Sequence, residues 1–200
     1  MTQKESALQL LKNVVQESSA DQTEAILLTE DSSLTRFAGS AVHQHVTERN
    51  QTAIFRVVLG KKIAVVTTNI FLPSSLKKSL REAISLAKVQ QPNDEFISLP
   101  GPKPVPVIET FSSNIGRLSP NQKVRIIKRL LRRVRNKGCH ASGAFSNGVV
   151  ELAVINSLGV EAYQRFSDLF LHLIVENEKS SGYASFVARD PDQLDVDSLA

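Results

Sequence analysis

The chain has 200 residues and a mass of 22.0 kDa, enough for one domain or two small ones that bury a core without disulfides. With 42% hydrophobic and 22% charged residues, its composition excludes a disordered tail, a collagen-like repeat and a disulfide framework. The sequence has one cysteine, no leading apolar run with a cleavage site, and no apolar stretch of about 18 residues. We therefore expect a cytoplasmic protein with no membrane partner.

The net charge of +4 is unevenly distributed. Of the 24 basic residues, nine lie between residues 110 and 150, where there is no Asp or Glu, and the other 15 are mixed with all 20 acidic residues. The basic character therefore belongs to one segment, which makes that segment a candidate for binding an acidic partner.

The first part of the chain predicts a helix followed by strands. The run Thr2-Gln3-Lys4-Glu5 has the spacing of a capping box, and apolar residues follow at three- and four-residue steps as far as Ser18. Segments rich in β-branched residues then predict strands at 25–30, 34–46 and 53–68. Gly60-Lys61 predicts a tight hairpin inside the last of them, because glycine accepts the positive φ of the first turn position.

Two further helices are separated by a proline-rich segment. A helix with one apolar side begins at Pro73 and ends near Val89. The five prolines in residues 91–116 favour extended backbone and exclude helix, so we expect a linker between two lobes. Ser119-Pro120 then supplies an N-cap and a proline at the first helical position of a helix that runs to Gly138. The expected parts are an α+β domain at 1–90, a linker at 91–118 and a second lobe at 119–200.

The second lobe is expected to be mainly antiparallel sheet. Asn147-Gly148 is the strongest short hairpin signal in the chain, because both residues tolerate the left-handed region, and it predicts flanking strands at 141–145 and 149–155. Further strands are predicted at 160–166, 169–176 and 183–188, with turns at 156–159 and 180–182. Hairpins and helices that do not alternate one for one predict an α+β fold: two lobes of mainly antiparallel sheet with amphipathic helices.

Four short blocks of the sequence carry a resemblance to a known family. They lie at residues 34–44, 57–69, 151–163 and 181–185. In this order the blocks resemble the TldD/PmbA family, peptidases that are also named modulators of DNA gyrase. The resemblance covers roughly residues 22–195, so it concerns nearly the whole chain.

The resemblance implies a zinc-dependent peptidase, a hydrolase that works as a homo- or heterodimer of TldD/PmbA-type subunits. It also implies a zinc site on a helix with a His-Glu-x-x-x-His pattern in the carboxy-terminal half, a pattern that these 200 residues lack. We therefore expect this chain to be the amino-terminal portion of such a subunit, providing scaffold, dimerisation and substrate-cavity surface. No catalytic, cofactor-binding or metal residue is assigned to it. Zinc, and a peptide or unfolded protein as substrate, are expected only for the complete protein.

The histidines and the cysteine are the residues that could carry metal or nucleophilic chemistry. No zincin motif is present, because glutamate follows none of the four histidines, His43, His45, His140 and His172. His43 and His45 are two residues apart on a predicted strand and could supply half of a metal site, but a half-exposed strand without metal is the favoured interpretation. Cys139 follows Lys137, whose charge could lower a thiol pKa, yet a small buried residue at a strand start is favoured over a nucleophile.

The helix over residues 119–138 is the remaining candidate. Its basic side chains could neutralise phosphates of nucleic acid, and they are Lys123, Arg125, Lys128, Arg129, Arg132, Arg133, Arg135 and Lys137. An ordinary amphipathic helix with a solvated polar face is favoured, since a buried stripe is expected at Val124, Ile127, Leu131 and Val134, widened by Ile126 and Leu130. Residues 112–144 contain no aromatic side chain on which bases could stack. Nucleic acid is therefore not the expected partner, and binding of nucleic acid or an acidic protein through this helix is the alternative function.

Overall fold

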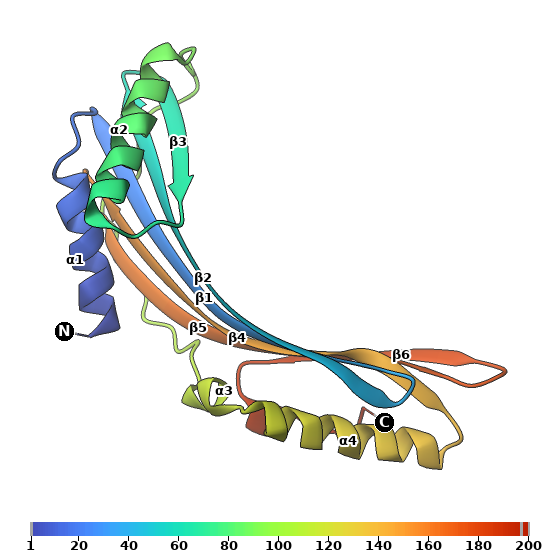
Figure 1. Ribbon diagram of the computed structural model, residues 1–200. Helices are drawn as coiled ribbons and strands as arrows, with labels where there is room; N and C mark the ends of the chain where they lie inside the picture. Colours follow the sequence, from blue (N-terminus) through green and yellow to red (C-terminus); the bar gives the residue numbers. More distant parts are fainter. Residues whose placement is uncertain (1, 197, 200) are drawn as a thin grey trace. The chain divides into compact units, whose positions relative to one another are not determined.

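The computed structural model describes residues 2–196, 198 and 199. The elements in chain order are α1 (Gln3–Val15), β1 (Gln22–Ala38), β2 (Ala41–Leu59), β3 (Lys62–Thr68), α2 (Pro73–Val89), α3 (Ser113–Arg117), α4 (Pro120–Asn136), β4 (His140–Asn156), β5 (Glu161–Glu176), β6 (Ser181–Ala188) and a short 3₁₀ helix at Pro191–Gln193 (Figure 1). The strands form one antiparallel sheet in the order β3-β2-β1-β4-β5-β6. The α+β class with antiparallel sheet is therefore confirmed.

The residues group into two compact units, each made of three separate segments. Unit 1 contains Met1–Thr29, Asn50–Ile108 and Glu151–Gln164, and unit 2 contains Glu30–Arg49, Glu109–Val150 and Arg165–Ala200. The units are not consecutive along the chain because β1, β2, β4 and β5 are 16 to 19 residues long, so that each contributes residues to both. The expected division into a domain at 1–90, a linker at 91–118 and a second lobe at 119–200 stays a prediction.

The local signals of unit 1 are confirmed. In the capping box of α1, the Glu5 amide donates to Thr2 Oγ1 and the Thr2 amide donates to Glu5 Oε2. The β2–β3 hairpin turns at Gly60-Lys61, since Leu59 pairs with Lys62 and Gly60 has a φ of 59°. Proline stands at the start of α2 as expected. One apolar cluster joins both helices to the strands, and its most buried large side chains are Leu11, Phe55, Leu76 and Leu80.

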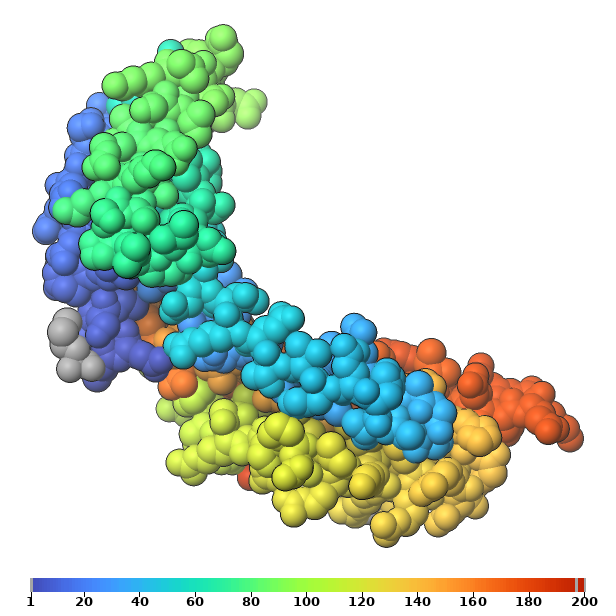
Figure 2. Space-filling view, in the orientation of Figure 1, coloured from blue at the N-terminus to red at the C-terminus, as the bar shows by residue number. Residues whose placement is uncertain are grey.

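Unit 2 is built around α4. Ser119 and Gln122 form a capping box at its start, and Gly138 has a φ of 72° just after its end. The buried face of α4 packs against one face of β4 and β5 in a cluster that includes Ile127, Leu130, Leu131, Val134, Phe145, Leu169, Leu171 and Leu173. This arrangement leaves the opposite side of α4 open to solvent (yellow in Figure 2).

The hairpin expected at Asn147-Gly148 is wrong. Neither residue has a positive φ, and β4 is one continuous strand that includes both of them. Gly148 is needed for space instead, because a Cβ at this position would lie 3.2 Å from the Asp31 carbonyl oxygen and 3.2 Å from Asp168 Oδ1. Contacts with Asp31, more than 100 positions earlier in the chain, and with Asp168, 20 positions later, therefore override the local turn signal. In the same way, β5 is one strand where the sequence predicted two, at 160–166 and 169–176.

Two further expectations need correction. The strand predicted at 34–46 is two strands, because the chain reverses at Gly39-Ser40, where both residues have positive φ (54° and 61°). The proline-rich segment is free of helix only up to Ser112, since Ser112 caps the one-turn helix α3. The segment is also anchored at Leu99, whose side chain is 3% exposed and whose amide donates to Gln22 Oε1 at 2.7 Å.

None of the helices in the described part of the chain is long and apolar enough to cross a lipid bilayer.

Candidate functional site

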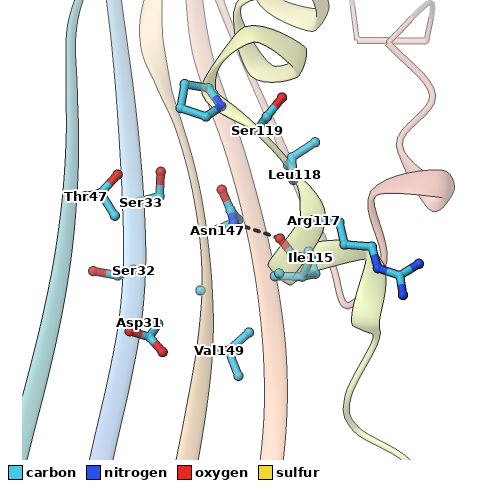
Figure 3. Close-up of a pocket in the computed structure, with 13 residues that line it drawn as sticks. Asp31, Ser32, Ser33, Thr47, Ile115, Arg117, Leu118, Ser119, Asn147 and Val149 are labelled. Atoms are coloured by element: carbon cyan, nitrogen blue, oxygen red, sulfur yellow. Dashed lines mark hydrogen bonds between the residues drawn. The ribbon is translucent and has the colours of Figure 1, made fainter.

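A cavity of about 360 Å³ lies within unit 2, between the start of α4 and the sheet (Figure 3). Strand residues Asp31, Ser32, Ser33 and Thr47 border it on one side, and the segment from Ile115 to Pro120 borders it on the other. Asn147, Gly148 and Val149 of β4 complete the wall. The cavity therefore has hydroxyl and amide groups on the sheet side and the first turn of α4 on the other.

A buried lysine stands next to this cavity. Lys123 is fully buried, although the sequence placed it on the solvated face of the helix. Its Nζ donates to Ser33 Oγ at 2.5 Å and lies 6.0 Å from the centre of the Phe145 ring. Burial lowers the pKa of Lys123 to about 8, because the apolar surroundings disfavour the charged form. None of the ion pairs found among the described residues includes Lys123.

The spacing along α4 contains the signal that sequence reasoning missed. Lys123 precedes Ile127, Leu130 and Val134 by four, seven and eleven positions, which is the period of one helical face, and all four side chains are buried. The expected stripe began at Val124 instead, and Val124 is only half-buried. The position of Lys123 on the same helical face as these apolar residues was therefore the sequence signal for a buried lysine.

Asn147 is the second unusual group at the cavity. Its side chain is 8% exposed and points from β4 toward the segment that runs from Ile115 to Ser119 (Figure 3). The Asn147 Nδ2 group donates to the Ile115 carbonyl oxygen at 3.4 Å. Its Oδ1 atom is buried and has no hydrogen-bond partner among the described residues. Such an unpaired acceptor costs about 1–3 kcal/mol, so it needs either a ligand or a water to offset it.

His45 is a polar residue close enough to Lys123 to be affected by its charge. The His45 ring contacts Thr35 Oγ1 at 2.8 Å through Nδ1 and Thr47 Oγ1 at 3.3 Å through Nε2. Burial, and then the nearby charge of Lys123, lower the pKa of His45 below its usual value. Burial and the nearby Lys123 charge therefore both disfavour the protonated form of this ring.

The histidines and the cysteine do not assemble into a metal or nucleophile site. His43 is exposed and has no contact that joins it to His45, and the described residues contain no group of three His, Cys, Asp or Glu side chains that could hold a metal ion. His172 packs beside Phe170 with 5.1 Å between ring centres. Cys139 is half-buried, and its Sγ atom lies near the Lys137 carbonyl oxygen and the Asn177 side-chain amide.

The outer face of α4 is strongly basic. Its exposed side chains include Arg125, Lys128, Arg132 and Arg135, which confirms the solvated polar face expected from the sequence except at Lys123. Lys128, Arg132 and Arg135 surround a shallow depression beside Ser40 and Val42.

The sequence matches no protein-family model and no curated protein. The structure does have clear neighbours. TldE from Thermococcus kodakarensis superposes with a TM-score of 0.87 at 18% identity, over 95% of this chain and 45% of that one. A proposed modulator of DNA gyrase from Thermotoga maritima gives a TM-score of 0.80 at 18% identity, over 98% and 45% of the two chains. A proposed modulator of DNA gyrase from Bacteroides thetaiotaomicron gives 0.84 at 10% identity, over 100% and 48%.

The fold is that of TldE and these gyrase modulators. The family resemblance that the sequence blocks indicated is therefore confirmed at the level of the fold. The chain spans less than half the length of each of these proteins. At 10–18% identity these matches concern the fold and say nothing of the chemistry of the cavity beside Lys123.

Proposed function

We propose that this chain is the amino-terminal portion of a TldD/PmbA-type metallopeptidase subunit, in which it provides scaffold, dimerisation and substrate-cavity surface. The likeness to TldE supports this, because 95% of the chain corresponds to 45% of that longer protein. Hydrolysis of a peptide or unfolded protein would then belong to the complete protein, acting with a second TldD/PmbA-type subunit.

The observation that carries the proposal is an uncovered apolar face on β5 and β6. One face of this strand pair packs under α4 through Leu169, Leu171 and Leu173. The register places Ile174 opposite Tyr183 and Phe170 opposite Val187, so these four side chains share the other face.

Three of these four side chains are largely exposed among the described residues. Ile174 is 49% exposed, Tyr183 66% and Val187 71%, whereas Phe170 is half-buried. Strands that are apolar on both faces are typical of sheets buried on both sides. In the proposal, the remainder of the subunit or its partner supplies the missing cover.

Zinc does not fit the residues of this chain. The described histidines do not converge with each other or with carboxylates, and His45 is already occupied by two threonine hydroxyls. We therefore assign no step of peptide hydrolysis to these residues. A zinc-bearing complete protein would hold its metal elsewhere, if it is a catalytic subunit.

Metal analysis and peptide digestion test the proposal directly. The purified chain is expected to contain no stoichiometric zinc and to digest neither casein nor unfolded peptides. The coding sequence downstream of Ala200 is expected to encode the cover for β5 and β6, and a His-Glu-x-x-x-His helix if the subunit is catalytic. One zinc per chain that is lost in His43→Ala would contradict the proposal.

The alternative function is binding of nucleic acid or an acidic protein through α4. The exposed basic side chains of Arg125, Lys128, Arg132 and Arg135 favour it. Charge-dependent binding weakens steeply with salt, because it depends on released counterions. Tight binding to duplex DNA or to an acidic protein at low salt, abolished in Arg132→Glu/Arg135→Glu, would support this function. Under the leading proposal we expect only weak binding of this kind.

A further inference from the structure

The charge of Lys123 is not balanced by any group described near it. Its ammonium has three N–H donors, and Ser33 Oγ is its one hydrogen-bond partner among the described residues. A buried charge is normally paired with an opposite charge, because leaving water costs several kcal/mol. An anion bound close to this lysine would balance the charge.

Ser33 connects the lysine to the cavity. Because Ser33 Oγ accepts a hydrogen bond from Lys123, the hydroxyl hydrogen of Ser33 has to point elsewhere, and Ser33 is one of the residues that line the cavity. Ser119 and Pro120 place the first turn of α4 at the same cavity, where the helix dipole favours negative charge. Both groups favour an acceptor that carries negative charge.

Asn147, in contrast to Ser33 and the start of α4, requires a hydrogen-bond donor from the ligand. Its unpaired Oδ1 atom is an acceptor, so a ligand that satisfies it has to donate a hydrogen bond. The carboxylate of Asp31 also borders the cavity, but it forms an ion pair with Arg49 at 3.4 Å. The guanidinium of Arg117 points away from the strands and adds little charge inside (Figure 3).

We propose that this cavity binds a carboxylate that has an N–H group on the neighbouring carbon, which is the chemistry of an N-acylated amino acid or the carboxy terminus of a peptide. The carboxylate accepts from the Ser33 hydroxyl and balances the charge of Lys123. The N–H group donates to Asn147 Oδ1. A volume of about 360 Å³ accommodates one or two residues.

Titration of the chain with three small probes tests this site at neutral pH. N-acetylalanine carries both features, its N-methylamide lacks the carboxylate, and propionate lacks the N–H group. N-acetylalanine is expected to shift the amide NMR signals of Ser33, Asn147 and the first turn of α4 in a saturable way. Each of the other two probes is expected to bind at least tenfold more weakly. The measurement does not depend on peptidase activity, so its outcome is independent of the proposed function.

Variants separate the site from general surface binding. Lys123→Met keeps the length of the side chain and removes its charge, so it should fold and lose at least tenfold in affinity for N-acetylalanine. Asn147→Leu should reduce binding of N-acetylalanine to the level of propionate. The matched control Lys128→Met removes an exposed charge from the same helix and should bind as the unmodified chain does.

Three results would overturn the proposal. They are equal affinity for N-acetylalanine and its N-methylamide, unchanged affinity in a folded Lys123→Met variant, and the absence of saturable shifts at the cavity residues up to the solubility limit of the probe.

Discussion

At the scale of single residues, Lys123 couples the stability of unit 2 to pH. Its pKa is about 8 in the folded chain and near its ordinary value of 10.5 in the unfolded chain. Below pH 8 the folded state therefore holds an ammonium that it disfavours, while above pH 8 it releases the proton and the unfolded state keeps it. Stability should rise with pH between these two pKa values, by roughly 3 kcal/mol in total for a shift of this size.

Lys123→Met tests this coupling. The free energy of unfolding of the unmodified chain, measured by urea denaturation, should gain about 2 kcal/mol between pH 7.5 and 10 relative to Lys123→Met, whose residue 123 cannot titrate. The control Lys128→Met should retain the gain, because Lys128 is exposed. Parallel pH profiles for the unmodified chain and Lys123→Met would contradict the assignment.

Gly143 and Gly182 form a second test at this scale. A Cβ at Gly143 would overlap the His172 carbonyl oxygen and lie 2.8 Å from Phe37 Cζ, whereas a Cβ at Gly182 would meet nothing within 4 Å. Gly143→Ala should therefore destabilise the chain by about 3 kcal/mol, since backbone has to move. Gly182→Ala on the edge strand should leave stability within about 0.5 kcal/mol. Similar urea midpoints for the two variants would contradict the close packing of Gly143 in β4 against His172 and Leu173 in β5.

At the scale of elements, the caps of α1 and α4 could be located from the sequence, because each cap is formed by residues three positions apart. The course of β4 could not. Asn147-Gly148 has the composition of a turn, and the strand passes through it because Gly148 lets Asp31 and Asp168 approach. Local signals therefore succeeded where the partners are neighbours in sequence and failed where they are distant.

The proline-rich segment gives a prediction about elements. Residues 91–116 should be the most protease-sensitive internal stretch, and within it the first cuts should fall at 103–108, where Val105, Val107 and Ile108 are 66%, 98% and 58% exposed. Cuts near Leu99 should come later, because its side chain is buried and its amide is hydrogen-bonded. Limited proteolysis with elastase and mass mapping tests this order. First cuts at 53–68 or 119–138 would contradict it.

At the scale of the whole molecule, β6 is an edge strand of the sheet and carries exposed apolar side chains. An exposed edge and an uncovered apolar face both favour association. We expect the isolated chain to dimerise or aggregate through unit 2. Association of this kind should persist in about 1 M salt, where the screening length of about 3 Å removes contacts between charges.

Light scattering at low and high salt, on nucleic-acid-free protein, tests the association. Tyr183→Lys/Val187→Lys should make the chain monomeric by placing charge on the apolar face. Val65→Lys is the control, because Val65 is 52% exposed on β3 at the other edge of the sheet, in unit 1. A monomer at every concentration, or association that disappears at high salt, would contradict burial of this face and would favour the basic helix as the interaction surface.

The sequence by itself determined the helix starts at Thr2 and Ser119, the hairpin at Gly60-Lys61, the α+β class and the resemblance to TldD/PmbA proteins, because each depends on residues adjacent in the chain. Only the tertiary structure decided that β4 continues through Asn147-Gly148, that Lys123 is buried against Ser33, and that Asn147 leaves an acceptor unpaired in a cavity. The physical reason is that burial and hydrogen-bond satisfaction are set by neighbours in space. Ser33 and Lys123 are 90 positions apart, and no local pattern relates them.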